Sequence, residues 1–389
     1  MPGAPTSHAL FEPIRIGDMD LAHRVVLAPL TRIRATDDHI PTEMMLEYYR
    51  QRSSTPGTFL LTEATLISQR AGGFINVPGV WNDAQVAEWK KIVDVVHANG
   101  CYIYCQLWAL GRAASAEQLA LEMPGADVVS SGDVQQDPNY VKPRPMTHAE
   151  IDEMVTFYAD AAKNAVFGAG FDGVEIHGAN GYLVDQFINE VTNNRTDEYG
   201  GSIEKRLKFP LRVVDAVIQA VGVSRTAIRL SPYERFSNML MDDPIPTFSA
   251  MISELKTRNI AYLHIIESRA ASAPGVYNPP APGSNENPET ESLDFARKIW
   301  APQPIILAGG YTPERAVKRA EEAAARGENA VIAFGRYFIA NPDLPLRLRK
   351  GIPLTRYDRS TFYAIKQAAG YIDYPFAVEA NGNGHANGV

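Results

Sequence analysis

Short apolar runs recur along the whole chain and alternate with longer amphipathic stretches. The runs are dense in Val, Ile, Leu and aromatic residues, as strands buried on both faces of a parallel sheet must be. The predicted strands are residues 24–29, 58–64, 101–108, 171–177, 226–232, 261–268, 304–310 and 329–335. The stretches between them have the period of surface helices; examples are residues 83–100, 149–170 and 312–327.

These eight alternations of strand and helix, with no sign of a second core, predict an α/β fold in the form of a closed (β/α)₈ barrel. The alternative is a doubly wound open sheet, which carries a glycine-rich fingerprint after its first strand. Here the first strand runs into LTRIRATD, and the nearest glycine match, GNGHANG at 382–388, lies in the tail. We therefore expect one barrel domain over residues 1–376 and a disordered tail over 377–389.

Two long segments interrupt the regular alternation of predicted strands and helices. Residues 109–148 follow the third strand and residues 268–290 follow the sixth, and both are rich in Pro, Gly and polar residues. Loops of this length without a helical or strand pattern are usually functional or disordered. Because both follow the carboxyl ends of strands, where barrel enzymes place their sites, we expect them to cover one pocket on the C-terminal face.

Composition and charge narrow the classes of partner. The 389 residues carry a formal net charge of −8, and their basic residues are scattered singly, which disfavours nucleic acid and anionic membranes as partners. No apolar stretch reaches the roughly 18 residues needed to cross a membrane, and the N-terminus does not resemble a secretory leader. We expect a cytoplasmic protein, a monomer or homodimer, that acts on a small molecule.

Neither a disulfide nor a metal site is predicted. Cys101 and Cys105 fall on one strand, where they would lie about 13 Å apart, too far for a disulfide. No His, Cys and carboxylate residues have the spacing of a metal-ligand set. The sequence therefore predicts no bound metal.

Glycines follow the last two predicted strands, at Gly309, Gly310 and Gly335, and Arg336 comes next. Barrels commonly bind phosphate at this place, through bare backbone N–H groups. The alternative is that the glycines only permit tight turns. We favour a phosphate site.

Polar side chains end other strands. Arg229 lies inside an apolar strand, so it needs either a carboxylate such as Glu63 or Glu175 or a bound group that gains negative charge. His177 is either a satisfied core residue or, with Asn180, a pair of donors for one carbonyl oxygen. Tyr182 follows the pair and could donate a proton.

Two long motifs carry a resemblance to a known family. HGANGYLVDQF at 177–187 and NRTDEYGGSIEKR at 194–206 resemble the old yellow enzyme family of FMN-dependent ene-reductases. The resemblance extends from residues 10–32 through 334–348 to 370–376. In detail the chain is similar to fungal members, including those that act on an unsaturated aldehyde in ergot alkaloid pathways.

The resemblance implies a role for each site residue. Thr31 would contact the flavin near N5, Gln106 would hold its pyrimidine edge, and Arg229 would stabilise the negative charge of the reduced ring. The full implied cofactor-binding set is Pro29, Leu30, Thr31, Ala64, Gln106, His177, Arg229, Gly309, Gly310, Gly335 and Arg336. Ala64 stands where many members have Gly. The implied catalytic residues are His177, Asn180, Tyr182 and Thr31, and the implied substrate-binding residues are Trp108, His177, Asn180, Tyr182, Phe236 and Tyr363.

The implied reaction passes a hydride from NADPH or NADH through FMN to the C=C bond of an α,β-unsaturated aldehyde or ketone. One alternative is a flavin-dependent isomerase with no net reduction. Another is an aldolase or isomerase barrel for a phosphorylated substrate, which would need a lysine or carboxylate at a strand end. Lys163 and Lys208 fall in predicted helices. A barrel that only binds a ligand is the weakest alternative, because it leaves the polar strand ends without a purpose.

Overall fold

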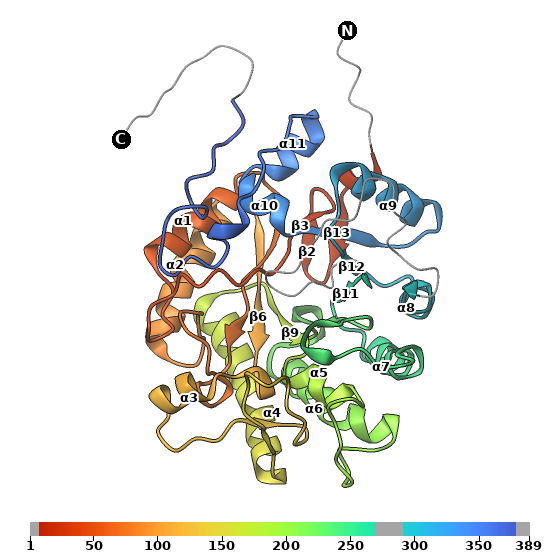
Figure 1. The fold of residues 1–389 in the computed structure, drawn as a ribbon. Helices are drawn as coiled ribbons and strands as arrows, with labels where there is room; N and C mark the ends of the chain where they lie inside the picture. Colours follow the sequence, from red (N-terminus) through yellow and green to blue (C-terminus); the bar gives the residue numbers. More distant parts are fainter. Residues whose placement is uncertain (1–7, 269–290, 379–389) are drawn as a thin grey trace.

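Eight parallel strands close into a barrel (Figure 1), which confirms the predicted fold. The structure is a computed structural model and describes residues 8–268 and 291–378. Pairing of the eighth barrel strand with the first closes the ring. The strands are β3 (Val25–Leu27), β4 (Phe59–Leu61), β6 (Tyr102–Trp108), β9 (Gly173–Gly178), β10 (Thr226–Leu230), β11 (Tyr262–Ile266), β12 (Ile305–Ala308) and β13 (Ala330–Phe334). Each falls within or beside a predicted run.

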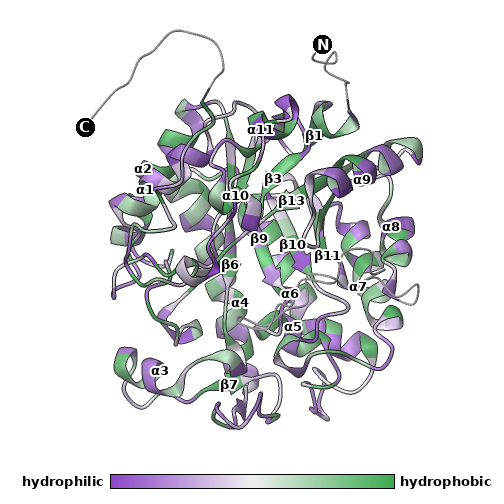
Figure 2. Ribbon diagram, turned by 45° about the horizontal axis from the view of Figure 1, so that its top comes forward, coloured by the Kyte–Doolittle hydropathy of each residue, from purple (hydrophilic) through white to green (hydrophobic). Residues whose placement is uncertain are grey.

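Helices surround the strands, and Figure 2 shows the apolar strands at the centre of helices that are banded with polar residues. They include α1 (Glu43–Arg52), α2 (Asp83–Ala98), α4 (His148–Lys163), α6 (Ile203–Val221), α7 (Ile245–Arg258), α8 (Asp294–Trp300), α9 (Pro313–Ala325), α10 (Arg336–Ala340) and α11 (Leu344–Lys350). The three predicted helices are confirmed as α2, α4 and α9. The hydroxyl of Thr312 caps α9 by accepting the N–H of Arg315. The prediction of one helix over 149–170 differs in detail, because α4 continues as a π-helix over Asn164–Ala169.

The interior of the barrel is apolar in the half nearer the N-terminal ends of the strands and polar in the half nearer their C-terminal ends. A hairpin of β1 (Ile14–Ile16) and β2 (Met19–Leu21) packs with inward side chains such as Phe59, Tyr104 and Tyr262. Its turn residue Gly17 lies against Ser224, which precedes β10, so the hairpin covers the N-terminal end. Toward the C-terminal end the interior side chains become polar, as at Gln106, Glu175 and His264.

The segment 109–148 is more ordered than predicted. It contains the 3-10 helix η3 (Gly111–Ala113), helix α3 (Ala116–Glu122) and two short paired strands, β7 (Val129–Ser130) and β8 (Arg144–Pro145). The expectation of a segment without helix or strand was wrong, because these elements are too short to show a period in the sequence.

Two further predictions fall largely outside the described residues. Of the predicted loop at 268–290, only Ser268 is described, and of the predicted tail only 377–378. The backbone N–H of Ala377 donates to Asp343 Oδ2 at 2.7 Å.

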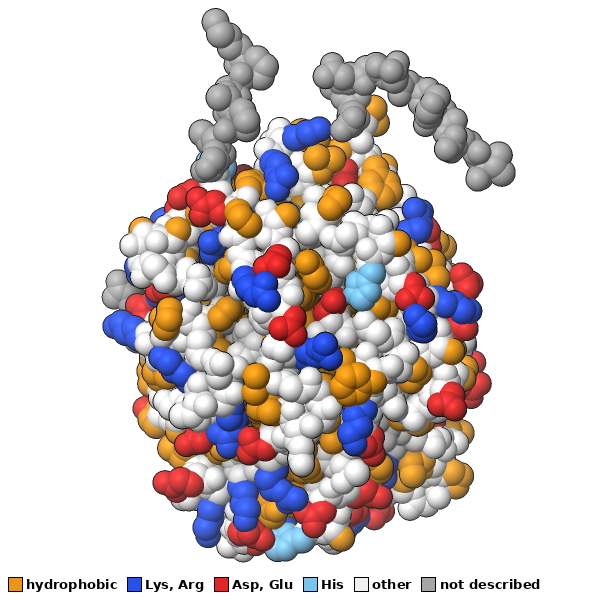
Figure 3. Space-filling view, turned by 180° about the vertical axis from the view of Figure 1, so that it is seen from behind, with side chains coloured by type: hydrophobic (Ala, Val, Ile, Leu, Met, Phe, Trp, Pro, Cys, Tyr) orange, Lys and Arg blue, Asp and Glu red, His pale blue; other side chains and the backbone are white. Residues whose placement is uncertain are grey.

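Three of the predictions concern cysteines, membrane-spanning helices and groups of metal ligands in the described part of the chain. Cys101 and Cys105 are buried free thiols. In residues 8–268 and 291–378, no helix is long and apolar enough to cross a membrane. Across the same ranges no three His, Cys, Asp or Glu side chains form a group that could hold a metal ion. Figure 3 shows acidic and basic side chains interspersed over the face opposite to that of Figure 1.

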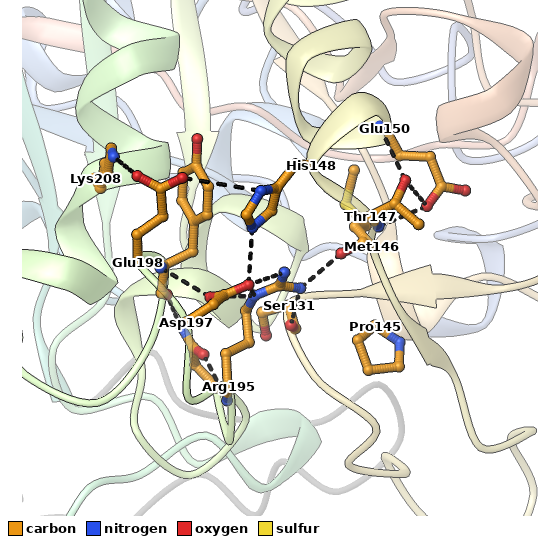
Figure 4. Close-up of polar contacts among 12 residues, drawn as sticks. Ser131, Pro145, Met146, Thr147, His148, Glu150, Arg195, Asp197, Glu198 and Lys208 are labelled. Carbon is orange, nitrogen blue, oxygen red and sulfur yellow. Dashed lines mark hydrogen bonds and ion pairs between the residues drawn. The ribbon is translucent and has the colours of Figure 1, made fainter.

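The loop after β6 is fastened to the loop after β9 by Arg195 (Figure 4). Its Nη1 donates to the carbonyl oxygens of Ser131 and Met146 at 3.1 and 2.7 Å. Its Nε and Nη2 donate to the Asp197 carboxylate, at 3.0 and 2.6 Å for the shorter contacts. Asp197 also lies 3.0 Å from His148 Nε2 at the start of α4. One guanidinium thus joins three segments at the outer edge of the C-terminal face.

We expect Arg195→Ala to lower the free energy of unfolding by about 3 kcal/mol, because a side chain only 8% exposed loses its contacts with two carbonyls and a carboxylate. Urea denaturation followed by circular dichroism measures the change. Lys163→Ala is the control, because Lys163 pairs with Asp160 on the surface and should change stability by less than about 1 kcal/mol. Equal stability of the two variants would contradict the proposed role of Arg195.

Candidate active site

A buried carboxylate organises the polar half of the barrel interior. Glu175 of β9 accepts hydrogen bonds from Gln106 Nε2 at 2.7 Å, from the Tyr262 hydroxyl at 3.0 Å and from His264 Nδ1 at 2.9 Å. The parallel register places Gln106 and Ala227 beside Glu175, so these side chains share one level of the barrel. Three donors from two other strands satisfy the carboxylate, as a buried charge requires.

Arg229 lies one level above, beside His177 and His264 in the register. Among the described residues no carboxylate lies within the 4.0 Å of an ion pair with its guanidinium. Its buried Nε has no hydrogen-bond partner within residues 8–268 and 291–378. Burial lowers the pKa of Arg229, and the nearby charges of Glu175 and Glu234 oppose that shift. The alternative of an ion pair with Glu63 or Glu175 is therefore wrong, and the guanidinium can bind an anionic or electron-rich group.

His177 and two aromatic rings form one wall. His177 is the penultimate residue of β9 and is buried. Burial together with the charge of Arg229 holds the pKa of His177 well below its usual value. The Tyr182 ring meets the His177 ring edge-on at 4.9 Å and the Trp108 ring at the same centroid distance. Loss of solvent raises the pKa of Tyr182, so its phenol keeps the proton at neutral pH. Ala64 packs in the same cluster.

Asn180 is held on both its backbone and its side chain by the loop after β10. It adopts a left-handed conformation with φ of 57°, and its backbone N–H donates to Ser231 Oγ at 2.9 Å. Its Nδ2 donates to Glu234 Oε2 at 2.6 Å. Glu234 Oε1 accepts the backbone N–H of Phe236 at 2.9 Å. The structure thus brings the predicted residues Asn180 and Phe236 together through an unpredicted carboxylate.

The next turn of the same motif contains a second buried acid. The N–H of Gly181, which has φ of 79°, donates to Asp185 Oδ2 at 2.9 Å. Burial raises the pKa of Asp185 to about 7, an effect that the charge of Glu234 reinforces. The turn that carries Asn180 is therefore flanked by two carboxyl groups.

The predicted phosphate residues meet at the ends of two neighbouring strands, β12 and β13. Gly310 has φ of 66°, and a Cβ added to it would lie 3.0 Å from Arg336 Nη2. A Cβ added to Gly335 would lie 3.1 Å from Leu30. The bare backbone of Gly310 therefore borders the Arg336 guanidinium, an arrangement suited to an anion. Gly309 is buried between β12 and Gly310.

The segment after β3 carries Pro29, Leu30 and Thr31 and supports the chain that leads to Tyr363. The backbone N–H of Arg32 donates to Glu63 Oε2 at 3.3 Å, and burial raises the pKa of Glu63 to about 7. Arg32 and Arg34 then donate from their guanidinium groups to carbonyl oxygens of residues 361–370. Tyr363 in that stretch is 49% exposed.

Sequence reasoning missed the residues that support the site, which are Glu63 in its supporting role, Glu175 as a hydrogen-bond centre, Glu234, Tyr262 and His264. A signal for some of them was present. Glu175 and His177 lie two apart on one strand, as do Tyr262 and His264, so each pair faces the same side. Polar pairs in otherwise apolar strands indicate an interior polar layer.

Three comparisons with known proteins agree. Residues 9–355 match the NADH:flavin oxidoreductase / NADH oxidase family. The chain is 47% identical over 371 residues to a chanoclavine-I aldehyde reductase of Penicillium roqueforti, covering 95% of this chain and 97% of the relative. It is 44% identical over 375 residues to a probable inactive dehydrogenase of Claviceps fusiformis, covering 96% of each.

The fold comparison points the same way. The crystal structure of an old yellow enzyme from a Pichia species superimposes with a TM-score of 0.86 at 36% identity, covering 99% of this chain and 97% of that one. Since the family match spans most of the chain and the relatives cover nearly all of it, the chain is an oxidoreductase that belongs to the NADH:flavin oxidoreductase / NADH oxidase family, with the fold of the old yellow enzymes.

Proposed function

We propose that this protein binds FMN without a covalent bond and uses NADPH or NADH to reduce the C=C bond of an α,β-unsaturated aldehyde or ketone. The observation that carries the proposal is Arg229, a barrel cation whose buried Nε has no partner among the described residues. An electron-rich flavin edge would complete it. The chanoclavine-I aldehyde reductase of Penicillium roqueforti named above supports an aldehyde as the substrate.

The residues of the candidate site fit both the phosphate and the ring of FMN. Gly309, Gly310, Gly335 and Arg336 would hold the phosphate, and Gln106, Arg229 and Thr31 would hold the ring, with Pro29, Leu30 and Ala64 beside it. Because Gln106 Nε2 already donates to Glu175, its Oε1 remains as an acceptor for a ring N–H. Bound FMN would supply the exchange of a hydride between the nicotinamide and the substrate.

His177 and Asn180 would clamp the carbonyl oxygen of the substrate. When hydride reaches Cβ, negative charge develops on this oxygen, and donors fixed in advance stabilise charge best where it develops. The depressed pKa of His177 keeps its ring neutral, so it donates one N–H rather than a charge. Trp108, Phe236 and Tyr363 would line the rest of the substrate site.

Tyr182 would then donate the proton at Cα. A phenol with a raised pKa is protonated throughout the neutral range and can act as an acid toward a strongly basic carbon. The proton makes the difference between net reduction and isomerisation, since an unprotonated enolate can return its hydride. We favour reduction, and a flavin-dependent isomerase is the second candidate because relatives with the name of an inactive dehydrogenase are 44% identical.

A barrel aldolase that forms a Schiff base is disfavoured. The residues that directly follow the described barrel strands include no lysine, and Lys163 and Lys208 lie in α4 and α6. The phosphate cradle would have to serve a substrate, which leaves the unpaired Nε of Arg229 unexplained.

We expect Gly310→Ala to weaken FMN binding about tenfold or more, because the added methyl group lies 3.0 Å from Arg336 Nη2. Titration of apoprotein with FMN, followed by flavin fluorescence, gives the Kd. Gly327→Ala is a matched control, since Gly327 has φ of 68° and nothing within 4 Å of its added Cβ; it adds similar backbone strain of about 1 kcal/mol away from the site. Equal Kd values for both variants, or FAD in place of FMN in the purified protein, would refute the assignment.

The carbonyl clamp predicts that His177→Ala and Asn180→Ala retain FMN but transfer hydride to substrate roughly 10² to 10³ times more slowly. The loss arises because one donor to the developing oxyanion disappears. Stopped-flow measurement of flavin reoxidation by an enone gives the rate. Normal reoxidation by both variants would show that other residues hold the carbonyl.

The proposed role of Tyr182 as proton donor predicts that the wild type consumes one NADPH for each saturated product that it forms. Tyr182→Phe should slow product formation while reduction of the flavin by NADPH keeps its rate, because only the proton donor is removed. Product analysis beside NADPH oxidation on a simple enal tests both statements. Isomerised alkene from the wild type without stoichiometric NADPH oxidation would favour the isomerase.

A further inference from the structure

Glu234 is a buried carboxylate without a cation. It follows β10, is 5% exposed, and has no Lys, Arg or His within the 4.0 Å of an ion pair among the described residues. Three N–H groups hold it instead. The backbone N–H groups of Arg235 and Phe236 donate to Oε1 at 3.0 and 2.9 Å, and Asn180 Nδ2 donates to Oε2 at 2.6 Å.

The carboxylate dictates which way the Asn180 amide faces. A carboxylate only accepts hydrogen bonds, so the nitrogen rather than the oxygen of the amide must point to it. A flipped amide would place Oδ1 against Oε2, with two acceptors in contact. Because the amide nitrogen has two N–H groups and one is bonded to Glu234, the second remains for another acceptor.

This orientation matters for the clamp. An oxygen that gains negative charge needs a donor, and a flipped Asn180 would present Oδ1 to it. The same carboxylate also holds the N–H of Phe236, so the donor and one wall of the substrate site share an anchor. Ser231, on the same loop, fixes the backbone N–H of Asn180.

We propose that Glu234 is a positioning residue that locks the Asn180 amide with its nitrogen toward the substrate oxygen. The inference rests on the proposed role of Asn180. It also predicts the direction in which the affinity for an anionic ligand changes when Glu234 is replaced. Loss of a nearby negative charge should by itself tighten the binding of an anionic ligand, whereas loss of the lock should weaken it.

The test is binding of a phenolate, 4-hydroxybenzaldehyde, to the FMN-loaded protein, followed by the perturbation of flavin absorbance. Glu234→Gln should weaken binding about tenfold to a hundredfold, since the Gln amide can donate to Asn180 Oδ1 and so permits the flipped state. Gln Oε1 still accepts the two backbone N–H groups, which preserves the loop. The signal comes only from flavin-loaded protein, so any unfolded fraction does not affect the Kd.

Asp242→Asn is the matched control, because it removes one charge from an exposed position on the same loop and should leave the Kd unchanged. In an Asn180→Ala background no amide remains to be locked, so Glu234→Gln should no longer weaken phenolate binding, and the lost charge alone should tighten it. Unchanged or tighter binding by Glu234→Gln, when Asn180→Ala alone binds weakly, would overturn the positioning role and leave the clamp intact. Unchanged binding by Asn180→Ala would instead refute the proposed clamp.

Discussion

Closure of the barrel is the constraint on which the rest of the structure depends. Once eight parallel strands form a ring, alternate side chains must face a common interior, and every polar one among them must find its partner there. Glu175 meets this condition with three donors from two other strands, β6 and β11. Arg229, one level higher, does not meet it within the described part of the chain, because its buried Nε has no partner there. The same geometry that satisfies the carboxylate therefore leaves Arg229 Nε without a partner among the described residues.

The walls of the site are loops, and buried arginines hold them together. Arg112 donates to the carbonyl oxygens of Val134 and Ser237, joining the loop after β6 to the loop after β10. Arg195 joins the first of these loops to the one after β9 (Figure 4), and Arg34 holds the chain near Tyr363. A guanidinium offers five donors in fixed directions, so one side chain can satisfy several carbonyls that no strand or helix pairs. Irregular backbone can thus remain ordered around a pocket.

Supporting carboxyl groups surround the turn that carries Asn180. Glu234 and Asp185 are both buried there, and each accepts an N–H group of the turn, from the Asn180 side chain and the Gly181 backbone respectively. The left-handed conformations of Asn180 and Gly181 make this turn tight enough for both contacts. Burial raises the pKa of Asp185 to about 7, and the charge of Glu234 adds to that rise. The turn is therefore held by two buried carboxyl groups, and the charge of one affects the pKa of the other.

The sequence by itself predicted the barrel, because apolar runs such as 304–310 and 329–335 alternate with helical stretches eight times along the chain. It also indicated a candidate site, since strand ends of a parallel barrel converge on one face. Gly310, Arg336 and Asn180 follow strands, and His177 lies next to the last residue of one. Tertiary structure alone decided which carboxylates support them. Asn180 and Glu234 lie 54 residues apart, and no local period relates them. Tertiary structure likewise decided that Arg229 pairs with neither Glu63 nor Glu175, because an ion pair depends on distances between strands rather than on the order of residues within one.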